Sequence, residues 1–465
     1  MRATLCQLLP HVTGAVLVGA DVAFDGVSTD SRKLPAGALF VALRGEIFDG
    51  HDFLPRVIGT DVTAVLAEKL PDGWTLPALL VPDTLVALGQ IAHFWRSQFS
   101  VPVLGVTGSN GKTTVKEMIA AVLAAAHGED GRLATRGNLN NEIGVPLTLF
   151  RMGPQHRAAV IEMGMNHPGE IGRLSAIAAP TLALVNNAQR EHQEFMHTVE
   201  AVARENGAAL AGLAADGVAV FPHDDEFTPL WRELSGARKV LTFGLTKDAD
   251  VSCTYRAGDF GSDMFVTVRT GAEPLQFFVG LQAAGAHNVM NALATVACTY
   301  GAGIAASDIK RGLESFAPVS GRLQKKMGAN GSIVIDDSYN ANPDSVRAAI
   351  DVLAQAPAPR VLVLGDMGEV GTQGRQFHEE IGAYAVSKGI EHVLATGDLA
   401  RHLLLPNAPH IEHFAHFDAL LAALDSHLAR LSGPSPVTVL IKGSRFMKME
   451  RAVQHLIGSP DKEAH

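Results

Sequence analysis

The sequence is poor in cysteine and in long apolar runs. Its 465 residues contain three cysteines, Cys6, Cys253 and Cys298, which are odd in number and widely separated. None of them has a CxxC or Cys/His metal-binding spacing, so the pattern favours a reduced, cytoplasmic compartment over a disulfide framework. No stretch reaches the roughly 18 consecutive apolar residues of a transmembrane helix, so we expect no membrane partner.

Positive charge is also scarce. The chain has 38 Lys and Arg against 48 Asp and Glu, a formal net charge of -10. Nucleic-acid binding depends on clustered Lys and Arg, so we expect no nucleic-acid partner. With 47% hydrophobic and 18% charged residues the composition is that of an ordinary globular protein, which we expect to be a monomer. The length favours about three domains.

The pattern of apolar runs predicts an α/β protein of three domains, over residues 1–84, 85–317 and 318–465. A linking helix over about 84–98 is expected because Pro82 disfavours helix before it and Asp83 or Thr84 can cap the next one. Strands alternating with helices then predict a parallel sheet covered on both faces. The expected strands are 37–43, 62–68, 101–107, 158–164, 181–187, 217–222, 332–337, 360–366, 392–397 and 437–443, with antiparallel strands within 250–282.

The segment TGSNGKTT (107–114) resembles a phosphate-binding loop with shortened spacing. The usual pattern is G-x-x-x-x-G-K-[ST], but here Val106 stands five residues before Gly111, and Gly108 is the first loop glycine. A buried strand precedes the loop and a helix follows it, so backbone N–H groups and the helix dipole can bind phosphate. Lys112 supplies a point charge and Thr113 a ligand for Mg²⁺. The alternative is a glycine turn before a helix.

Polar residues at the ends of neighbouring strands extend this site. Glu162 ends an apolar strand and His192 follows the next strand, and in open α/β sheets ligands bind beyond the carboxyl ends of strands. Both are therefore candidate metal ligands beside Thr113, although a surface carboxylate and a structural histidine remain alternatives. The polar loop 135–146 fits a substrate site or ordinary turn chemistry.

Together these motifs resemble the ATP-dependent Mur ligases, which build the peptidoglycan precursor. TGSNGKTT is similar to their shortened phosphate loop, and HNVMNALA (287–294) to their adenine-side helix. Within the family, DDSYNANPDS (336–345), LGDMGEVG (364–371) and VLIKGSRFMKME (439–450) resemble the branch that adds D-alanyl-D-alanine. STDSRKLPAGALFVALRGEIFDGHDF (28–53) resembles its UDP-binding segment. The resemblance extends from about Val27 to Val453.

The resemblance implies a small N-terminal α/β UDP-binding domain, a central parallel-sheet ATPase domain with the phosphate loop, and a C-terminal Rossmann-like ligase domain. It further implies ATP and Mg²⁺, and two small-molecule substrates, UDP-MurNAc-tripeptide and D-Ala-D-Ala. The tripeptide carboxylate would attack the γ-phosphate of ATP, and the dipeptide amine would displace phosphate from the resulting acyl phosphate.

The resemblance also assigns residues to these roles. The catalytic candidates are Lys112, Glu162, His192 and Arg322, and the metal ligands are Thr113, Glu162 and His192. The ATP-binding candidates are Gly108, Ser109, Asn110, Gly111, Lys112, Thr113, Thr114, Asn291, Arg322, Asp337 and Tyr339. The UDP end is assigned to Ser31, Arg32, Arg44 and Gly45, and the central substrate site to Asn138, Asn140, Asn141 and Glu142. The D-Ala-D-Ala and tripeptide ends are assigned to Asn340, Asn342, Lys442, Ser444 and Arg445, for which loop polarity is the alternative.

One position departs from the family pattern. Family members usually carry a carbamylated lysine, a metal-binding anion, where this chain has Asn206, and no lysine occurs between Lys116 and Lys239. Arg204 cannot replace it, because guanidinium stays protonated. We hypothesise that Asn206 offers a neutral amide oxygen, directly or through water, to a more weakly bound second Mg²⁺. Glu205 is the alternative anion, although adjacent helix positions point about 100° apart.

Three other functions remain open at this point. A Mur-type ligase for a different amino acid and a folylpolyglutamate synthase belong to the same superfamily. The segment DSYNANP (337–343) and the N-terminal UDP-binding segment argue against both. A P-loop kinase or regulatory NTPase would need only the central domain, and it would leave the C-terminal motifs without a role.

Overall fold

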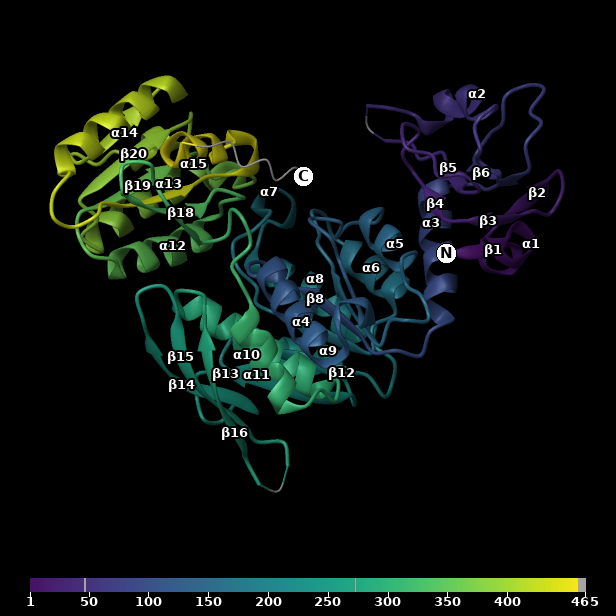
Figure 1. Cartoon of the computed structure of the whole chain (residues 1–465), viewed down its shortest axis with the longest axis horizontal. Coiled ribbons are helices and arrows are strands. Elements are labelled where there is room, and N and C mark those ends of the chain that lie inside the picture. Colours follow the sequence, from purple (N-terminus) through teal and green to yellow (C-terminus); the bar gives the residue numbers. More distant parts are fainter. Residues whose placement is uncertain (46, 272, 459–465) are drawn as a thin grey trace.

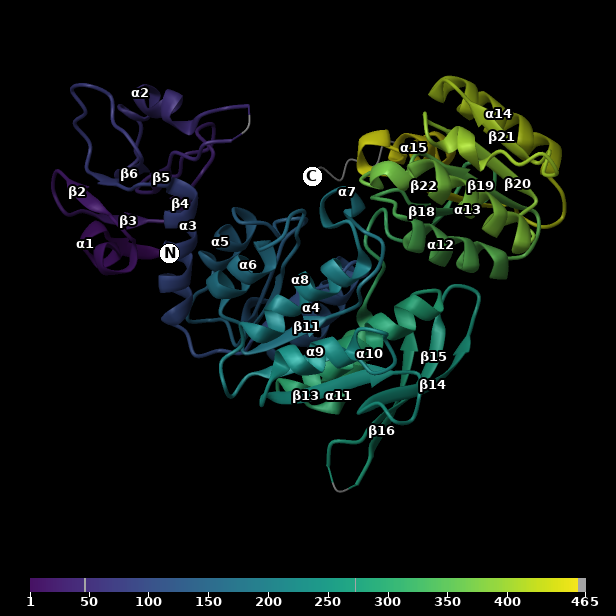
Figure 2. The same ribbon diagram turned by 180° about the vertical axis from the view of Figure 1, so that it is seen from behind.

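The computed structural model describes residues 1–45, 47–271 and 273–458. Figure 1 shows three α/β bodies in series, with the N-terminal and C-terminal bodies at opposite ends of the central one. The view from behind in Figure 2 shows the same order. No helix among the described residues is long and apolar enough to cross a membrane.

The N-terminal body contains a five-stranded sheet in the order β2-β7-β6-β5-β4 and a two-stranded ribbon, β1-β3. Its central strand, AVLA, is buried at every position, as expected for a strand with parallel neighbours on both sides. Its elements are β1 (Arg2–Thr4), α1 (Leu5–Leu8), η1 (Leu9–His11), β2 (Val16–Val18), β3 (Ala23–Asp25), β4 (Val27–Ser28), β5 (Leu39–Val41), η2 (Gly50–Phe53), α2 (Leu54–Val57), β6 (Ala64–Ala67) and β7 (Ala78–Leu80).

The linking helix α3 (Thr84–Ser97) begins where the sequence predicts. Asp83 is its N-cap, and the Asp83 carboxylate accepts hydrogen bonds from the backbone N–H groups of Leu85 (2.8 Å) and Val86 (2.9 Å). Capping of this kind stabilises a helix start by about 1 kcal/mol.

The central body is built on a nine-stranded sheet in the order β16-β15-β14-β13-β12-β11-β8-β10-β9. Its strands are β8 (Val103–Thr107), β9 (Arg132–Ala134), β10 (Ala158–Glu162), β11 (Leu182–Val185), β12 (Val218–Pro222), β13 (Lys239–Gly244), β14 (Val251–Ala257), β15 (Ser262–Val268) and β16 (Leu275–Leu281). The seven strands β8 to β14 pair in parallel, whereas β15 pairs antiparallel with both β14 and β16. The sheet is therefore mixed, because the antiparallel strands expected within 250–282 extend the parallel sheet.

Helices cover both faces of this sheet, as predicted. Its helices are α4 (Lys112–His127), α5 (Gly144–Leu149), α6 (Glu170–Ala178), α7 (Gln193–Met196), α8 (Val199–Ala211), α9 (Thr228–Ser235), α10 (Ala286–Gly301) and α11 (Ala306–Ser315). One apolar core lies under α4, α10 and α11, and another under α6, α8 and α9. Helices α11 and α4 pack closely, since a Cβ atom on Gly312 would lie 2.3 Å from the Cα atom of Val122.

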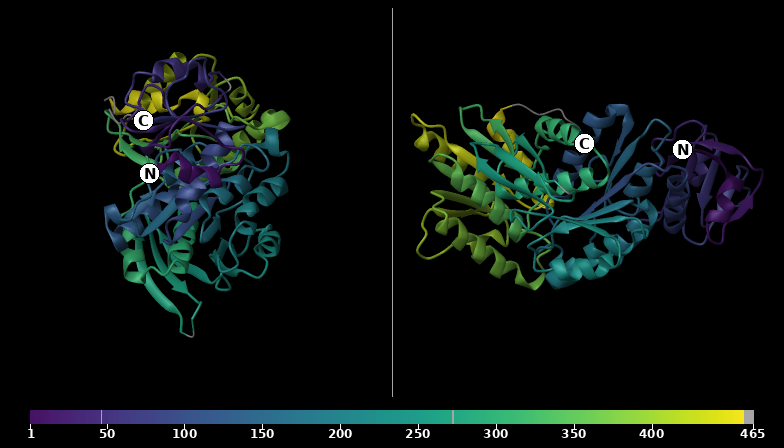
Figure 3. Two further views of the ribbon diagram at one scale, coloured as in Figure 1. Left: turned by 90° about the vertical axis from the view of Figure 1, so that its right-hand side faces the viewer. Right: turned by 90° about the horizontal axis from the view of Figure 1, so that it is seen from below.

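The C-terminal body has a six-stranded sheet in the order β17-β18-β22-β19-β20-β21. Helices α12 and α13 cover one face and α14 and α15 the other, each over its own apolar core. Figure 3 shows this body from two further directions. Its elements are β17 (Gln324–Met327), β18 (Ile333–Asp337), α12 (Pro343–Gln355), β19 (Arg360–Leu364), η4 (Gly371–Gln373), α13 (Gly374–Ser387), β20 (His392–Thr396), η5 (Ala400–Leu403), β21 (Ile411–Phe414), α14 (Phe417–Leu431), β22 (Thr438–Lys442), η6 (Arg445–Met447) and α15 (Glu450–Ile457).

Candidate functional site

The phosphate loop joins β8 to α4 in a conformation that depends on its glycines. Gly108 and Gly111 have φ values of 133° and 80°, in the region that favours glycine. A Cβ atom on Gly111 would also lie 2.4 Å from Oδ1 of Asn291, so the loop packs directly against helix α10. The loop leads directly into the N-terminus of α4, where free backbone N–H groups and the helix dipole favour an anion.

Lys112 is held back on its own loop. Its Nζ donates hydrogen bonds to the carbonyls of Gly108 (2.5 Å) and Ser109 (3.0 Å), and it lies 3.2 Å from Oε2 of Glu191. An ammonium group has three donors. All three are used here, and Lys112 must exchange at least one of these partners to bind phosphate.

Glu162 lies at the carboxyl end of β10, the neighbour of β8, and meets Thr113 as predicted. Its Oε1 accepts hydrogen bonds from the Thr113 hydroxyl (3.1 Å) and from Nδ2 of Asn140 (2.9 Å). Its backbone N–H donates to Thr135 Oγ1, which fixes the strand end. The other carboxylate oxygen, Oε2, is buried without a hydrogen-bond partner among the described residues.

The segment after β11 is fastened to the phosphate loop by short hydrogen bonds. The N–H of Ser109 donates to the Asn187 carbonyl (3.2 Å), and the N–H of Asn110 donates to Asn187 Oδ1 (2.8 Å). Gln189 donates its N–H to Ser109 Oγ (2.8 Å) and accepts from Nδ2 of Asn110 (2.6 Å). Asn187 and Gln189 are thereby held in place against the phosphate loop.

His192 stands between two carboxylates from different domains. Its Nδ1 lies 2.7 Å from Oε2 of Glu369, in the C-terminal body, and its Nε2 lies 3.8 Å from Oε2 of Glu191. Hydrogen bonding to His192 is the main cause that lowers the pKa of Glu369. His192 also has φ of 48°, a strained backbone for a non-glycine residue, as is common at functional sites.

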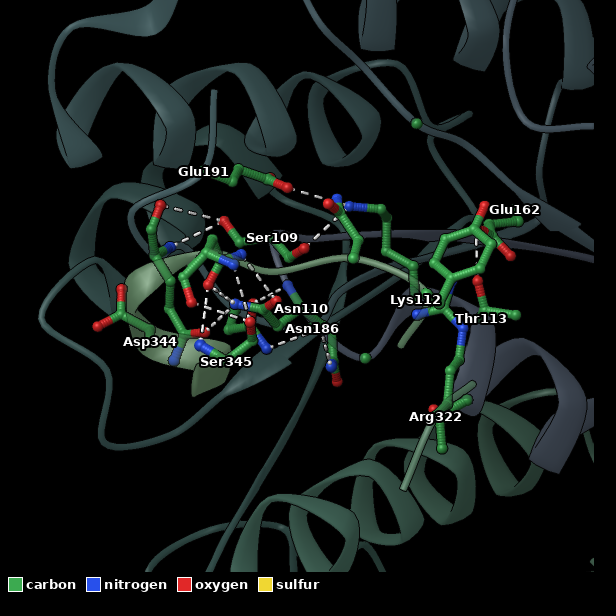
Figure 4. Close-up of a pocket in the computed structure, with 18 of the residues that line it drawn as sticks. Ser109, Asn110, Lys112, Thr113, Glu162, Asn186, Glu191, Arg322, Asp344 and Ser345 are labelled. Atoms are coloured by element: carbon green, nitrogen blue, oxygen red, sulfur yellow. Dashed lines mark hydrogen bonds and ion pairs between the residues drawn. The ribbon is translucent and has the colours of Figure 1, made fainter. Parts of the chain in front are cut away.

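The C-terminal body closes over the phosphate loop. Asn110 and Asn342 exchange two amide hydrogen bonds, of 3.3 Å and 3.0 Å. Arg190 reaches across to Asp344 (2.6 Å) and Glu380 (2.9 Å). Burial alone would lower the pKa of Arg190, but the hydrogen bonds to the two carboxylates outweigh burial and raise it. Figure 4 shows Arg322, Asp344 and Ser345 of the C-terminal body around the labelled residues of the phosphate loop.

A buried ion pair lies across the cavity from the loop. Lys442 Nζ donates to Oδ2 of Asp337 (2.6 Å) and to the carbonyl of Asn340 (2.9 Å). Burial raises the pKa of Asp337, and Lys442 opposes that rise. The Arg322 guanidinium lies 4.2 Å from the centre of the Tyr339 ring, a cation–π contact that orients it.

These parts line one cavity of about 930 Å³ between the central and C-terminal bodies. The predicted residues that line it are Ser109, Asn110, Gly111, Lys112, Thr113, Thr114, Asn138, Asn140, Asn141, Glu142, Glu162, His192, Asn291, Arg322, Asp337, Tyr339, Asn340, Asn342 and Lys442. The predicted residues outside its lining are Gly108, Ser444, Arg445, Ser31, Arg32, Arg44 and Gly45.

Ser444, Arg445 and the four UDP candidates make other contacts or lie in another domain. Ser444 is buried and accepts a hydrogen bond from the Gly368 N–H (2.6 Å), so it supports a loop, and Arg445 pairs with Glu450. The four UDP candidates belong to the N-terminal body, at the far end of the molecule in Figure 1. Among them, Arg32 pairs with Asp30 and Arg44 pairs with Asp49 and Glu68.

The structure corrects the hypothesis for Asn206. Its side chain is fully buried at the base of the phosphate loop, where Oδ1 accepts hydrogen bonds from the Thr107 hydroxyl (2.6 Å) and the Gly108 N–H (3.1 Å). Both lone pairs of the amide oxygen are used, so it is not free to bind a metal. Glu205 does not replace it, because its carboxylate accepts from the N–H groups of Gly169 and Ile171 at the start of α6.

The donors present fit a divalent cation that is bound together with a nucleotide. Among the described residues, no three His, Cys, Asp or Glu side chains are gathered as a preformed metal site. Mg²⁺ usually takes only one or two protein carboxylates and completes its shell with water and substrate phosphates. The unpartnered Oε2 of Glu162 beside Thr113 matches that requirement.

Several residues of the site were not predicted from the sequence. The missed contributors to the cavity or its closure are Asn186, Asn187, Gln189, Arg190, Glu191, Asp344 and Glu369. The rule that ligands bind beyond the carboxyl ends of strands could have indicated Asn186 and Asn187. The partners of Arg190 and Glu191 depend on tertiary contacts that no local pattern encodes.

Comparisons with known proteins agree along the whole chain. Residues 23–122 match the model of the Mur ligase family, catalytic domain, residues 106–299 the Mur ligase middle domain, and residues 321–445 the Mur ligase, glutamate ligase domain. The UDP-N-acetylmuramoyl-tripeptide--D-alanyl-D-alanine ligase of Escherichia coli (strain K12) is 39% identical over 97% of this chain and 98% of that protein.

Solved structures give the same result. A crystal structure of MurF from Acinetobacter baumannii is 33% identical, with a TM-score of 0.92 over 99% of each chain. The crystal structure of MurF ligase from Thermotoga maritima in complex with ADP is 26% identical, with a TM-score of 0.82 over 94% of this chain and 98% of that one. The extent and identity of these matches, together with the shortened phosphate loop and the cavity it lines, establish that this chain belongs to the Mur ligase family.

Proposed function

We propose that this protein joins D-alanyl-D-alanine to UDP-N-acetylmuramoyl-tripeptide with hydrolysis of ATP to ADP and phosphate, in peptidoglycan precursor synthesis. The observation that carries this function is one cavity in which Lys112, Thr113 and Glu162 of the central body face Arg322 and Lys442 of the C-terminal body. A nucleotide switch or kinase would need no second α/β body over its phosphate loop. The full-length relative from Escherichia coli named above carries this activity in its name.

The chemistry proceeds in two steps. The terminal carboxylate of the tripeptide attacks the γ-phosphorus of ATP, which forms an acyl phosphate and releases ADP. The amine of D-Ala-D-Ala then attacks the acyl carbon and loses a proton, the C–O bond to the phosphate breaks, and inorganic phosphate leaves with the former carboxylate oxygen. Both steps require charge neutralisation and alignment more than covalent help from the protein.

The residues of the cavity supply that neutralisation and alignment. Lys112 leaves its loop carbonyls to neutralise the phosphates, and Arg322 approaches them from the opposite wall. Thr113 and Glu162 hold Mg²⁺, which neutralises phosphate charge when bound with ATP. Asn138, Asn140 and the other polar residues of loop 138–142 line the side where the peptide substrate binds. The N-terminal body, with Ser31, Arg32, Arg44 and Gly45, binds the UDP end.

His287 adds a neutral polar group at the nucleotide end of the cavity. Burial is the main cause that lowers its pKa to about 4, and the nearby Lys442 lowers it further. At neutral pH its imidazole is therefore uncharged and can accept or donate one hydrogen bond without repelling Lys442.

We place the enzyme in the cytoplasm, where ATP and nucleotide-linked precursors are available.

Phosphate release from ATP tests this function directly. With UDP-MurNAc-tripeptide present, release should depend on D-Ala-D-Ala and should produce the pentapeptide, which mass spectrometry detects. A matched reaction with L-Ala-L-Ala controls for a non-specific amine. Release at the same rate without any dipeptide would contradict the ligase function and favour a simple NTPase.

A further inference from the structure

Glu191 is a buried carboxylate for which the mechanism so far has no use. It lies in the segment between β11 and α7, on the wall of the cavity, and only 7% of its surface is exposed. Its backbone is fixed by a hydrogen bond from its N–H to the Gln189 carbonyl (2.8 Å) and by one from Gln193 Nε2 to its own carbonyl (3.1 Å). The side chain is thus held beside the phosphate loop (Figure 4).

The contacts of this carboxylate are incomplete. Oε2 lies 3.2 Å from Lys112 Nζ and 3.8 Å from His192 Nε2. Oε1 is buried with no hydrogen-bond partner among the residues the structure describes. A buried carboxylate with one free oxygen has room for another cationic or donor group.

Nucleotide binding changes the charge balance at this position. Lys112 must turn toward the phosphates, which removes the cation that now compensates Glu191. The carboxylate would then face the polyphosphate, and two anions in a partly buried site repel each other. A cation that arrives with the nucleotide restores the balance, and the imidazole of His192 lies beside this position.

His192 is oriented to take part. Its Nδ1 faces the Glu369 carboxylate, so that its Nε2 points toward Glu191. The 2.7 Å separation of Nδ1 from Glu369 Oε2 does not meet hydrogen-bond geometry, but a carboxylate beside one ring nitrogen is common at metal-binding histidines and leaves the other nitrogen for the ion. The Nε2 of His192 and the carboxylate of Glu191 therefore present adjacent donors to the same space.

We propose that Glu191 exchanges Lys112 for a divalent cation when nucleotide binds, and that it holds this ion together with His192. In the nucleotide-free protein the Glu191–Lys112 pair occupies the phosphate loop in place of a ligand. The inference rests on the proposed function for the identity of the nucleotide, and it assigns to Glu191 a negative charge that Asn206 does not provide.

The exchange predicts opposite effects of Glu191→Gln with and without metal. Without metal, the variant should bind ADP at least about threefold more tightly than the wild type, because no ion pair with Lys112 has to be broken. With Mn²⁺ as the probe ion and ADP at saturation, the variant should bind the more weakly held Mn²⁺ about 10- to 100-fold less tightly. A merely structural role would weaken both kinds of binding.

The measurements are calorimetric titration of ADP in EDTA and electron paramagnetic resonance of free Mn²⁺ in the presence of ADP. Glu194→Gln is the matched control, since Glu194 is an exposed carboxylate three residues away and should leave both affinities unchanged. Glu191→Asp keeps the negative charge, so it should bind Mn²⁺ in the presence of ADP more tightly than Glu191→Gln does. This variant keeps the proposal testable if Glu191→Gln folds poorly.

Equal Mn²⁺ binding in Glu191→Gln and wild type, or weaker ADP binding by the variant in EDTA, would overturn the exchange. Neither measurement uses a peptide substrate. If phosphate release by the wild type did not require D-Ala-D-Ala, the proposed ligase function would be wrong. The ADP and Mn²⁺ measurements would still test the role of Glu191.

Discussion

Arg190 links the central and C-terminal bodies, and its removal should impair catalysis without touching the nucleotide. Its guanidinium forms a bidentate contact with Asp344, from Nη2 to Oδ1 (2.6 Å) and from Nε to Oδ2 (3.2 Å), and a second ion pair with Glu380 (2.9 Å). The side chains of Arg190 and Asp344 are each 22% exposed. In Arg190→Met the apolar stem is kept, but the two carboxylates lose the cation that joins them across the interface.

The size of the effect follows from this geometry. A bidentate, charge-assisted contact is stronger than an exposed ion pair, but partial exposure screens it, so each of the two pairs contributes about 1–1.5 kcal/mol. Their sum of about 2–3 kcal/mol corresponds to a loss of about 30- to 150-fold in kcat/KM for ATP if Arg322 must be positioned by the closed C-terminal body. The assay is dipeptide-dependent phosphate release.

Two comparisons isolate the contact between domains. Arg347→Met is the matched control, because Arg347 pairs with Glu380 within the C-terminal body and should change kcat/KM by less than about threefold. In a double-mutant cycle, Asp344→Asn should add little to Arg190→Met. If the two substitutions were additive, or if Arg190→Met stayed within threefold of wild type, the contact would have no part in positioning the C-terminal body.

Two further outcomes concern the phosphate loop and pH. Lys112→Ala should lower phosphate release by at least about 10³-fold, because it removes the charge that neutralises the phosphates, and near-normal release would mean the loop is misread. His378 is fully buried, accepts a hydrogen bond from the Met367 N–H (3.1 Å), and has its pKa lowered mainly by burial. Its folded-state pKa lies below its unfolded value of about 6.5, so the stability it contributes is present above that pH and is lost as pH falls through the acid range. Thermal unfolding from pH 7.5 to pH 5 should show a larger loss for the wild type than for His378→Gln, and equal losses would refute this assignment.

Much of the fold could be predicted because its strands are buried and apolar. The runs at 158–164, 181–187 and 217–222 became β10, β11 and β12, and the helix expected after the phosphate loop became α4. Strands β9 and β17 were missed, because they are short or half exposed and carry no continuous apolar signal. Edge strands of this kind are defined by their neighbours more than by their own residues.

The site divides in the same way. Thr113 and Glu162 were predicted to meet because parallel strands bring their carboxyl ends to one edge of the sheet, and the structure joins them by a hydrogen bond. The Asn206 hypothesis was wrong because a position in a motif does not determine what a shorter side chain contacts. Asn206 reaches only the base of the loop, whereas Glu191 has a free carboxylate oxygen and lies beside Lys112.

The two kinds of contact between the central and C-terminal bodies differ in how easily they can be broken. Arg190 is joined to two carboxylates, but the Asn110–Asn342 pair over the phosphate loop is neutral and reciprocal. Each hydrogen bond between the two side-chain amides contributes only about 1 kcal/mol net to holding the bodies together, because water replaces each partner when they separate. The amide seam over the phosphate loop is therefore the weaker of the two joints, and we expect it to separate before the charged joint at Arg190 does.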